Sequence, residues 1–328
     1  MGTHTNSLSV VAGLMVGTGA IVTFSSTSAT AATLSLSSLS QLYVFGDSLV
    51  DDGNVFAFTQ GTYPASPPYF QGRLSNGPVW VEQLATLLGL PPNPPTNFAF
   101  GGSSTGLGNA VFPTIPLPGT LAQVLNFAQA TPQADPNGLY ILSAGGDDYL
   151  FGGVTASTQP LQDITTAVST LLSIGAKTVL VANLPNLGEI PATLNTPLSG
   201  ALSALTTLHN GGLAQRLASL AAQFDAHVLL LDQNAAFNRV LANPTSFGLT
   251  NVTAPCLTSA GTCSNPNQFL FWDTIHPTEI GHHLLAEDAF STLQTAAAVP
   301  EPSGVAGAIG FTVFSLGWWV RQRRRAAK

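Results

Sequence analysis

Charged side chains are scarce in this sequence. Only 8% of its 328 residues are Asp, Glu, Lys or Arg, and five of the nine basic residues lie between 321 and 328. The rest of the chain keeps four basic residues against the acidic residues found from Asp47 to Asp288. Such a surface repels nucleic acid, and Lys177, the one lysine of this part, leaves no phosphate-binding loop of the Walker type. We expect no nucleic-acid partner.

Cysteine is equally rare. The two cysteines, Cys256 and Cys263, lie close together in a polar stretch rich in Gly, Ser, Asn and Pro. An even pair at this spacing favours a disulfide-closed loop in an exported protein, and two reduced thiols in a cytosolic loop are the alternative. No His or Cys spacing nearby is typical of zinc, so we expect neither a metal ion nor a cofactor.

The N-terminal segment, residues 1–32, lacks Lys and Arg. It nevertheless contains an apolar stretch at 8–24 and the small residues Ala29, Thr30 and Ala31, which are typical of a cleavage site. We therefore expect a signal peptide at 1–32, with an uncleaved membrane-tethered segment as the alternative. Signal-peptide cleavage would leave the rest of the chain outside the cytoplasm.

The C-terminal segment, residues 299–328, has three parts. Val299-Pro300-Glu301-Pro302 precedes an uncharged apolar run at 303–320, and a basic tail follows. The run is just long enough to span a bilayer as a helix, and the basic tail would stay cytoplasmic. These parts, in this order, resemble the PEP-CTERM sorting signal of Gram-negative exporters. The resemblance implies transient membrane anchoring, removal by a C-terminal sorting protease, and a periplasmic, cell-surface or extracellular protein.

Residues 33–298 are expected to form one domain, because neither an internal repeat nor a second core is visible. Apolar patterning predicts strands at 41–45, 97–100, 138–143, 178–183, 226–231 and 269–272, and helices at 79–90, 121–130, 163–174, 198–224 and 278–296. Alternating strands and helices indicate a parallel sheet sandwiched between helices. In such sheets the ligand site lies at the carboxyl ends of the strands.

Four polar turns each follow an expected strand. They are FGDSLVDDGN at 45–54, NFAFGG at 97–102, GGDD at 145–148 and FWDTIHPT at 271–278. Taken alone, the first is typical of any turn followed by a helix cap. A serine becomes a nucleophile when a base takes its proton and a carboxylate orients that base, which Ser48, His276 and Asp273 would provide. The backbone N–H groups of Ser48 and Gly102 and the side chain of Asp147 are candidate oxyanion donors.

These four blocks resemble those of the GDSL, or SGNH, hydrolase family. The stretch SPPYFQGRLSNGPVWVEQLA at 66–85 is similar to the lecithinase, haemolysin and plant-lipase branch, and the resemblance covers about 41–296. It implies a flavodoxin-like three-layer α/β/α sandwich and ester hydrolysis through an acyl-enzyme. Ser48 would be the nucleophile, His276 the base, Asp273 its orienting carboxylate and Gly102 an oxyanion donor.

The third block departs from the family pattern. The family normally has Gly-x-Asn-Asp there and uses the Asn amide as an oxyanion donor, whereas this chain has Asp147. An ionised carboxylate only accepts hydrogen bonds. Either Asp147 stays protonated in an apolar site, or the two backbone donors suffice. The expected result is a slow hydrolase that works better at mildly acid pH until His276 protonates.

Two other motifs compete for the same chemistry. Gly102-Ser103-Ser104-Thr105-Gly106 fits the G-x-S-x-G pattern, but that nucleophile elbow opens directly into a helix, and residues 107–119 are too rich in Pro and Gly. His282 and His283 lack a matching acid or Cys cluster, so we expect them on a packed or solvated helix face. His209 and His227 are expected to be structural.

The prediction is an exported serine esterase or lipase acting on a small-molecule or lipid ester. The aromatic and Pro-rich loops at 56–70 and 106–119 are expected to form an apolar acyl pocket. A deacetylase acting on extracellular polysaccharide is one alternative. A catalytically weak matrix or adhesion protein that keeps the fold is another.

Overall fold

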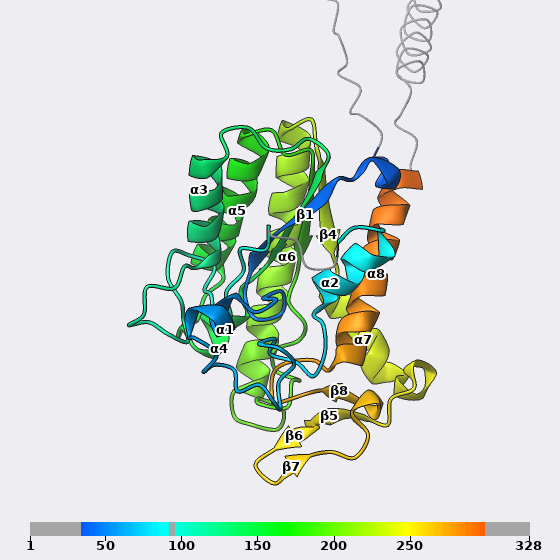
Figure 1. Ribbon diagram of the computed structural model, residues 1–328. Coiled ribbons are helices and arrows are strands. Elements are labelled where there is room, and N and C mark those ends of the chain that lie inside the picture. The colour runs from blue at the N-terminus through cyan, green and yellow to red at the C-terminus, as the bar shows by residue number, and fades with distance from the viewer. Residues whose placement is uncertain (1–33, 92–95, 299–328) are drawn as a thin grey trace, which may run out of the picture. The chain divides into compact units, whose positions relative to one another are not determined.

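The computed structural model describes residues 34–91 and 96–298 (Figure 1). The predicted signal peptide at 1–32, the sorting segment at 299–328 and its apolar run at 303–320 lie outside the described residues. Among the described residues, no helix combines the length and the apolar character that a membrane crossing needs.

The centre of the domain is a parallel sheet of four strands. Its order is β1 (Gln41–Gly46), β2 (Gly138–Ser143), β3 (Thr178–Ala182) and β4 (His227–Leu231). Every residue of β2 and β3 is buried, as the continuous apolar runs of these strands predict. Because all four strands run the same way, their carboxyl ends lie along one edge of the sheet.

Helices cover both faces of the sheet, as Figure 1 shows. The side chains of Val44, Ile141 and Leu180 pack in one buried cluster that includes residues of α2 (Trp80–Leu87) and α8 (Glu279–Ala298). Alternate residues of the same strands pack in a second cluster with α3 (Thr120–Ala130), α5 (Thr158–Ser173) and α6 (Ser199–Gln223). The predicted three-layer α/β/α sandwich is confirmed.

Several elements differ from the sequence-based expectation. Residues 97–100 do not form a full strand, and only a parallel bridge between Val44 and Asn97 extends the sheet beyond β1. The 269–272 segment forms β8 (Phe269–Phe271), which pairs with β5 (Asn251–Pro255) in a separate sheet. The sequence reasoning also missed three helices, α1 (Asn54–Phe58), α4 (Gly146–Leu150) and α7 (Gln233–Ala242). Two of these have only five residues, too few for a helical period to show.

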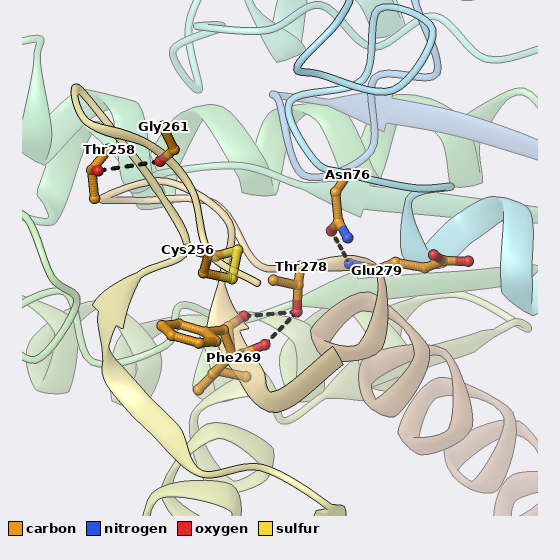
Figure 2. Close-up of a disulfide and its surroundings, with 9 residues drawn as sticks. Asn76, Cys256, Thr258, Gly261, Phe269, Thr278 and Glu279 are labelled. Atoms are coloured by element: carbon orange, nitrogen blue, oxygen red, sulfur yellow. Dashed lines mark hydrogen bonds between the residues drawn. A yellow bond between two sulfur atoms is a disulfide. The ribbon is translucent and has the colours of Figure 1, made fainter. Parts of the chain in front are cut away.

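A disulfide joins Cys256 and Cys263, beside the short hairpin of β6 (Leu257–Thr258) and β7 (Gly261–Thr262) (Figure 2). The Cys256 N–H donates to the Phe271 carbonyl at 3.0 Å, and the Leu257 N–H donates to the Trp272 carbonyl at 2.6 Å. The disulfide-closed loop is therefore attached to the chain immediately before Asp273.

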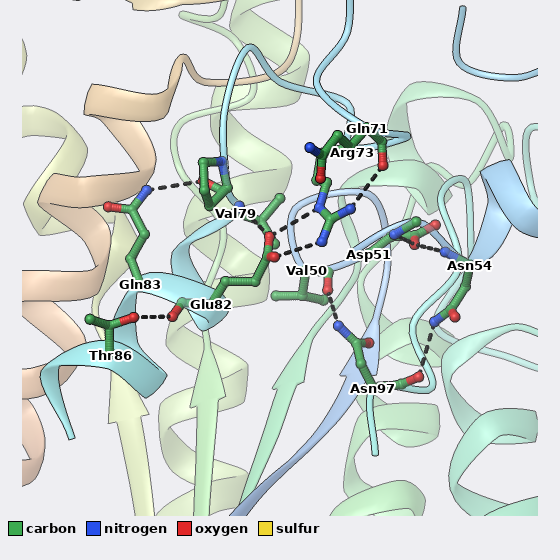
Figure 3. Close-up of polar contacts among 12 residues, drawn as sticks. Val50, Asp51, Asn54, Gln71, Arg73, Val79, Glu82, Gln83, Thr86 and Asn97 are labelled. Atoms are coloured by element: carbon green, nitrogen blue, oxygen red, sulfur yellow. Dashed lines mark hydrogen bonds and ion pairs between the residues drawn. The ribbon is translucent and has the colours of Figure 1, made fainter. Parts of the chain in front are cut away.

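A buried ion pair anchors the loop at 63–78. The Arg73 guanidinium binds Glu82 of α2 through Nη2 at 2.7 Å and Nε at 3.2 Å (Figure 3), and it also donates to the Gln71 carbonyl at 2.8 Å. Further along, Ser75 Oγ donates to the Pro277 carbonyl at 2.9 Å. This loop is thus held between α2 and the segment that leads into α8.

Candidate active site

The turn that carries Ser48 begins where β1 ends. A Cβ on Gly46 would lie 2.1 Å from the Ser143 carbonyl oxygen, so only glycine fits beside β2 at this point. The Gln123 side chain of α3 binds both backbone groups of Gly46, accepting from its N–H at 2.8 Å and donating to its carbonyl at 3.0 Å. The turn therefore has a fixed direction at the edge of the sheet.

Ser48, His276 and Asp273 form one chain of hydrogen bonds. Ser48 Oγ lies 2.9 Å from His276 Nε2, and His276 Nδ1 lies 2.7 Å from Asp273 Oδ2. The other oxygen of Asp273 accepts the N–H groups of Ile275 at 2.8 Å and His276 at 2.7 Å. With the imidazole proton on Nδ1, Nε2 is free to accept from the serine hydroxyl.

The surroundings of Asp273 and His276 shift the pKa values of both side chains. Burial alone would raise the pKa of Asp273, but His276 and the two N–H groups lower it to about 2. Burial alone would lower the pKa of His276, but the carboxylates of Asp273 and Asp47 raise it above its usual value. Asp273 is therefore ionised at neutral pH, and the imidazolium form of His276 is stabilised.

Thr278 hydrogen-bonds back to β8 and so connects the two ends of the segment that contains Asp273 and His276 (Figure 2). Thr278 Oγ1 donates to the Phe269 carbonyl at 2.7 Å, and the Thr278 N–H donates to the Leu270 carbonyl at 2.9 Å. Thr278 also caps α8, because its Oγ1 accepts the Gly281 N–H at 3.3 Å. This cap was predicted from the sequence and is confirmed.

Tyr69 is a site residue that sequence reasoning missed. Its hydroxyl donates to Asp273 Oδ2 at 2.8 Å, the same oxygen that receives His276 Nδ1. The Tyr69 ring also packs edge-on against Trp272. An aromatic residue in a proline-rich loop carries no sequence signal for this contact.

Two backbone N–H groups at the sheet edge are candidate oxyanion donors. Those of Ser48 and Gly102 make no hydrogen bond within the part of the chain that the structure describes. Gly102 has a φ of +81°, and a Cβ there would lie 2.6 Å from Asn109 Oδ1, so glycine is required. The Phe100 N–H donates to the Gly46 carbonyl at 3.1 Å, which places the Gly101-Gly102 turn beside the Ser48 turn.

Asp51 connects these two turns, and the sequence reasoning did not assign it this role. Its carboxylate accepts the Gly101 N–H at 2.8 Å and the Asn54 N–H at 2.6 Å. Figure 3 shows Asn54 and Asn97 beside it, and the Asn54 amide donates to the Asn97 carbonyl at 3.0 Å. The spacing of the turns is therefore set by buried polar contacts.

Asp147 lies in α4 and is buried, with 7% of its surface exposed. Its Oδ2 has no hydrogen-bond partner among the described residues. Burial, together with the nearby Asp47 and Asp148 carboxyls, raises its pKa well above the usual value. Asp148, in contrast, accepts the N–H and the hydroxyl of Thr105 at 2.9 and 2.8 Å. Burial also raises the pKa of Asp148, but these two hydrogen bonds to Thr105 oppose the shift, whereas Asp147 has no hydrogen bond that lowers its pKa.

A largely apolar pocket lies next to this site. Its lining includes Ser48 and Asp147 together with residues that follow β3, residues of α7 and residues of α8. The expected acyl pocket from the loops at 56–70 and 106–119 is not what forms here, since neither loop contributes a lining residue. The spacing of α7 from α8, which a sequence does not reveal, creates the pocket instead.

Residues 42–289 match the model of the GDSL-like lipase/acylhydrolase family. The chain belongs to this family. It is 30% identical to the phosphatidylcholine-sterol acyltransferase of Aeromonas hydrophila, over 78% of this chain and 90% of that protein. It is 26% identical to the thermolabile hemolysin of Vibrio parahaemolyticus, over 76% of this chain and only 62% of the relative.

Solved structures of similar fold include a member of the lipolytic protein G-D-S-L family from Veillonella parvula DSM 2008. It is 19% identical, with a TM-score of 0.45, over 77% of this chain and 98% of that one. A likeness of this degree says nothing about activity.

In this GDSL family member, the side chains of the G-x-S-x-G stretch at 102–106 and of His282 make hydrogen bonds that give them structural roles. Ser104 Oγ donates to the Gly108 carbonyl at 2.7 Å, and the next helix begins only at Thr120, so the G-x-S-x-G pattern does not form a nucleophile elbow. His282 is buried and accepts the Trp80 N–H at 3.2 Å, and burial lowers its pKa to about 3.

The other histidines that the structure describes also have partners. His283 Nδ1 lies 2.9 Å from Gln83 Oε1, and His209 Nδ1 lies 2.8 Å from the Tyr149 hydroxyl. His227 is half-buried at the start of β4. Across residues 34–91 and 96–298, no group of three or more His, Cys, Asp or Glu is arranged to hold a metal ion.

We expect Tyr69→Phe to raise the pKa of His276. Without the phenol hydrogen bond, the Asp273 carboxylate attracts the imidazolium more strongly, and the shift should be roughly 0.5–1 unit. An NMR titration of the His276 ring measures it. Tyr43→Phe is the matched control, because the Tyr43 ring packs on Tyr140 and Phe127, on the face of the sheet that α3 covers. Equal pKa values in the parent and Tyr69→Phe would show that the contact has no electrostatic effect.

Proposed function

We propose that this GDSL family protein is a serine ester hydrolase that works through an acyl-enzyme on Ser48. The observation that supports this most directly is the hydrogen-bonded chain from Ser48 through His276 to Asp273. Ser48 lies at the carboxyl edge of the sheet and lines a pocket, so a bound ester carbonyl has access to its hydroxyl.

The reaction has two steps. In the first, His276 takes the Ser48 proton as Oγ attacks the ester carbonyl, and it then gives this proton to the leaving alcohol. In the second, His276 activates a water that releases the acid and restores Ser48. Asp273 holds the Nδ1 tautomer and stabilises the imidazolium, while the Tyr69 hydroxyl, bound to the same carboxylate oxygen, holds the carboxylate in place.

The oxyanion is stabilised by the N–H groups of Ser48 and Gly102 and by a protonated Asp147. Asp147 Oδ2 has no hydrogen-bond partner within the described part of the chain, and the pKa of its carboxyl is raised; both observations support this assignment. A neutral carboxyl can donate one hydrogen bond, as the Asn amide of the family pattern would. Asp147, which stands where the family pattern has Asn, can therefore still donate to the oxyanion, but only at pH values at which its carboxyl is protonated.

Ser48→Ala should lower kcat/KM for p-nitrophenyl acetate by roughly 10⁴-fold or more, because no other hydroxyl in the site is bound to His276. The rate of p-nitrophenol release measures this. Ser104→Ala is the control and should match the parent, since Ser104 Oγ is bound to the Gly108 carbonyl. A Ser48→Ala variant that retains most of the activity would contradict the assignment.

The pH dependence of the parent should be bell-shaped. On the acid side the rate rises as His276 loses its proton, at a pH above the usual histidine pKa because that pKa is raised. On the alkaline side the rate falls as Asp147 ionises and stops donating. Loss of such a donor costs roughly 10²–10³-fold in a protease.

Asp147→Asn should keep the acid side and abolish the alkaline fall, because an amide donates at every pH. Profiles of kcat/KM against pH for the two proteins, measured with one ester, provide the test. If the parent and Asp147→Asn profiles coincide on the alkaline side, Asp147 is not an oxyanion donor.

We also propose that the protein is exported, with residues 1–32 as a signal peptide and 299–328 as a PEP-CTERM sorting signal read by a membrane protease. The terminal sequence patterns and the Cys256–Cys263 disulfide support this proposal. In a Gram-negative host with the matching sorting system, we expect a mature protein that has lost both segments. Intact-mass measurement decides this, and recovery of the full 328-residue chain from the cytoplasm would be the opposite result.

A further inference from the structure

We propose that the pocket beside Ser48 holds the acyl chain of the substrate between α7 and α8, and that it selects esters of medium-chain fatty acids. This inference rests on the proposed function of Ser48. It adds the substrate class and the residues that set it.

The pocket adjoins the atom that carries the acyl group. Ser48 and Asp147 both line it, and so do Ile275 and Pro277, the two neighbours of His276 in the chain. In the acyl-enzyme the acyl group is bound to Ser48 Oγ, whereas the alcohol has left after taking its proton from His276. We therefore assign the pocket to the acyl chain.

Two helices form the long walls of the pocket. From α7 the lining residues are Gln233, Ala236, Phe237 and Val240, and from α8 they are Gly281, Leu284, Leu285 and Asp288. Both sets follow the spacing i, i+3, i+4, i+7, which is one face of a helix. Each face runs along two helical turns, a length of about 10 Å at the helical rise of 1.5 Å per residue.

The chemistry of the walls suits a hydrocarbon chain. Leu270 and Phe271 of β8 and Ile190 complete the lining between the two helices. Among the described residues that line the pocket there is no lysine or arginine. The lining also includes the polar side chains of Asp47, Asn183 and Gln233, but most of it is apolar, and an acyl chain gains by transfer from water to such walls.

An ion pair marks where the apolar face of α8 stops. Asp288 lines the pocket, and both of its oxygens lie 2.6 Å from Nη2 of Arg239 on α7. A chain that reaches this point meets charged groups and gains nothing from further methylenes. The pair therefore limits the useful chain length.

The test compares p-nitrophenyl esters of acetate, butyrate, octanoate and palmitate. Between acetate and octanoate, kcat/KM should rise with chain length, by at most about fourfold for each methylene that is buried. From octanoate to palmitate it should rise no further. The same rate on acetate and octanoate would overturn the pocket and leave the role of Ser48 intact, whereas a protein that hydrolyses none of these esters contradicts both.

Ala236→Phe places a ring in the pocket from a position that is buried in the parent. We expect the ratio of octanoate to acetate activity to fall at least tenfold. The matched control is Ala235→Phe, the same change at the next residue, which is exposed and does not line the pocket; its ratio should equal that of the parent. Equal ratios in Ala236→Phe and Ala235→Phe would overturn the proposal.

A second variant changes the pocket in the opposite direction and keeps the test decisive if Ala236→Phe does not fold. Leu284 is only half-buried, so Leu284→Ala should disturb folding less than Ala236→Phe does. The smaller side chain widens the pocket on the side of α8. We expect the ratio of palmitate to octanoate activity to rise severalfold. An unchanged ratio would mean that the chain does not run along α8.

Discussion

The hydrogen bond of 2.9 Å between Ser48 and His276 joins residues that are 228 positions apart in the chain. The fold has to hold the Ser48 hydroxyl and the His276 ring within hydrogen-bond distance of each other. The sheet brings Ser48 to its carboxyl edge, and the cap at Thr278 fixes the segment that presents His276. A displacement of about 1 Å in either support would be enough to weaken the chemistry proposed for them.

Buried polar contacts, not only apolar packing, provide this precision. Gln123 binds the backbone of Gly46, and Asp51 binds the turn that leads to Gly102. The loop with Tyr69 is fixed by the Arg73–Glu82 pair and by Ser75, which donates to the Pro277 carbonyl. Because buried polar groups are costly to leave unpaired, each of these contacts favours one arrangement of the turns.

Much of the fold could be predicted from the sequence because its strands are continuous apolar runs and because α2 and α5 have a clear helical period. The 97–100 segment misled the reasoning, because at the edge of the sheet it bonds only around Val44 and Gly46 and does not pair along its length. The helix α7 was missed for a different reason. Its one buried face lines a pocket, so its sequence lacks the strong apolar pattern of a core helix.

Some residues of the candidate site could likewise be predicted from the sequence, and others could not. Ser48, Gly102, Asp273 and His276 could be named because each occurs in a motif whose residue types have a chemical reason. Tyr69 and the pocket between α7 and α8 could not, since they depend on which segments meet in space. Asp147 was identified as a departure from the family pattern, but only the structure shows that its burial and its acidic neighbours raise the pKa of its carboxyl.

The most direct measurement of the central claim is covalent labelling with an alkyl fluorophosphonate, followed by peptide mapping. Such reagents react with a serine that a neighbouring base activates. The account predicts one label per chain, on the peptide that contains Ser48. A label on another serine, or no label on a folded protein, would contradict it.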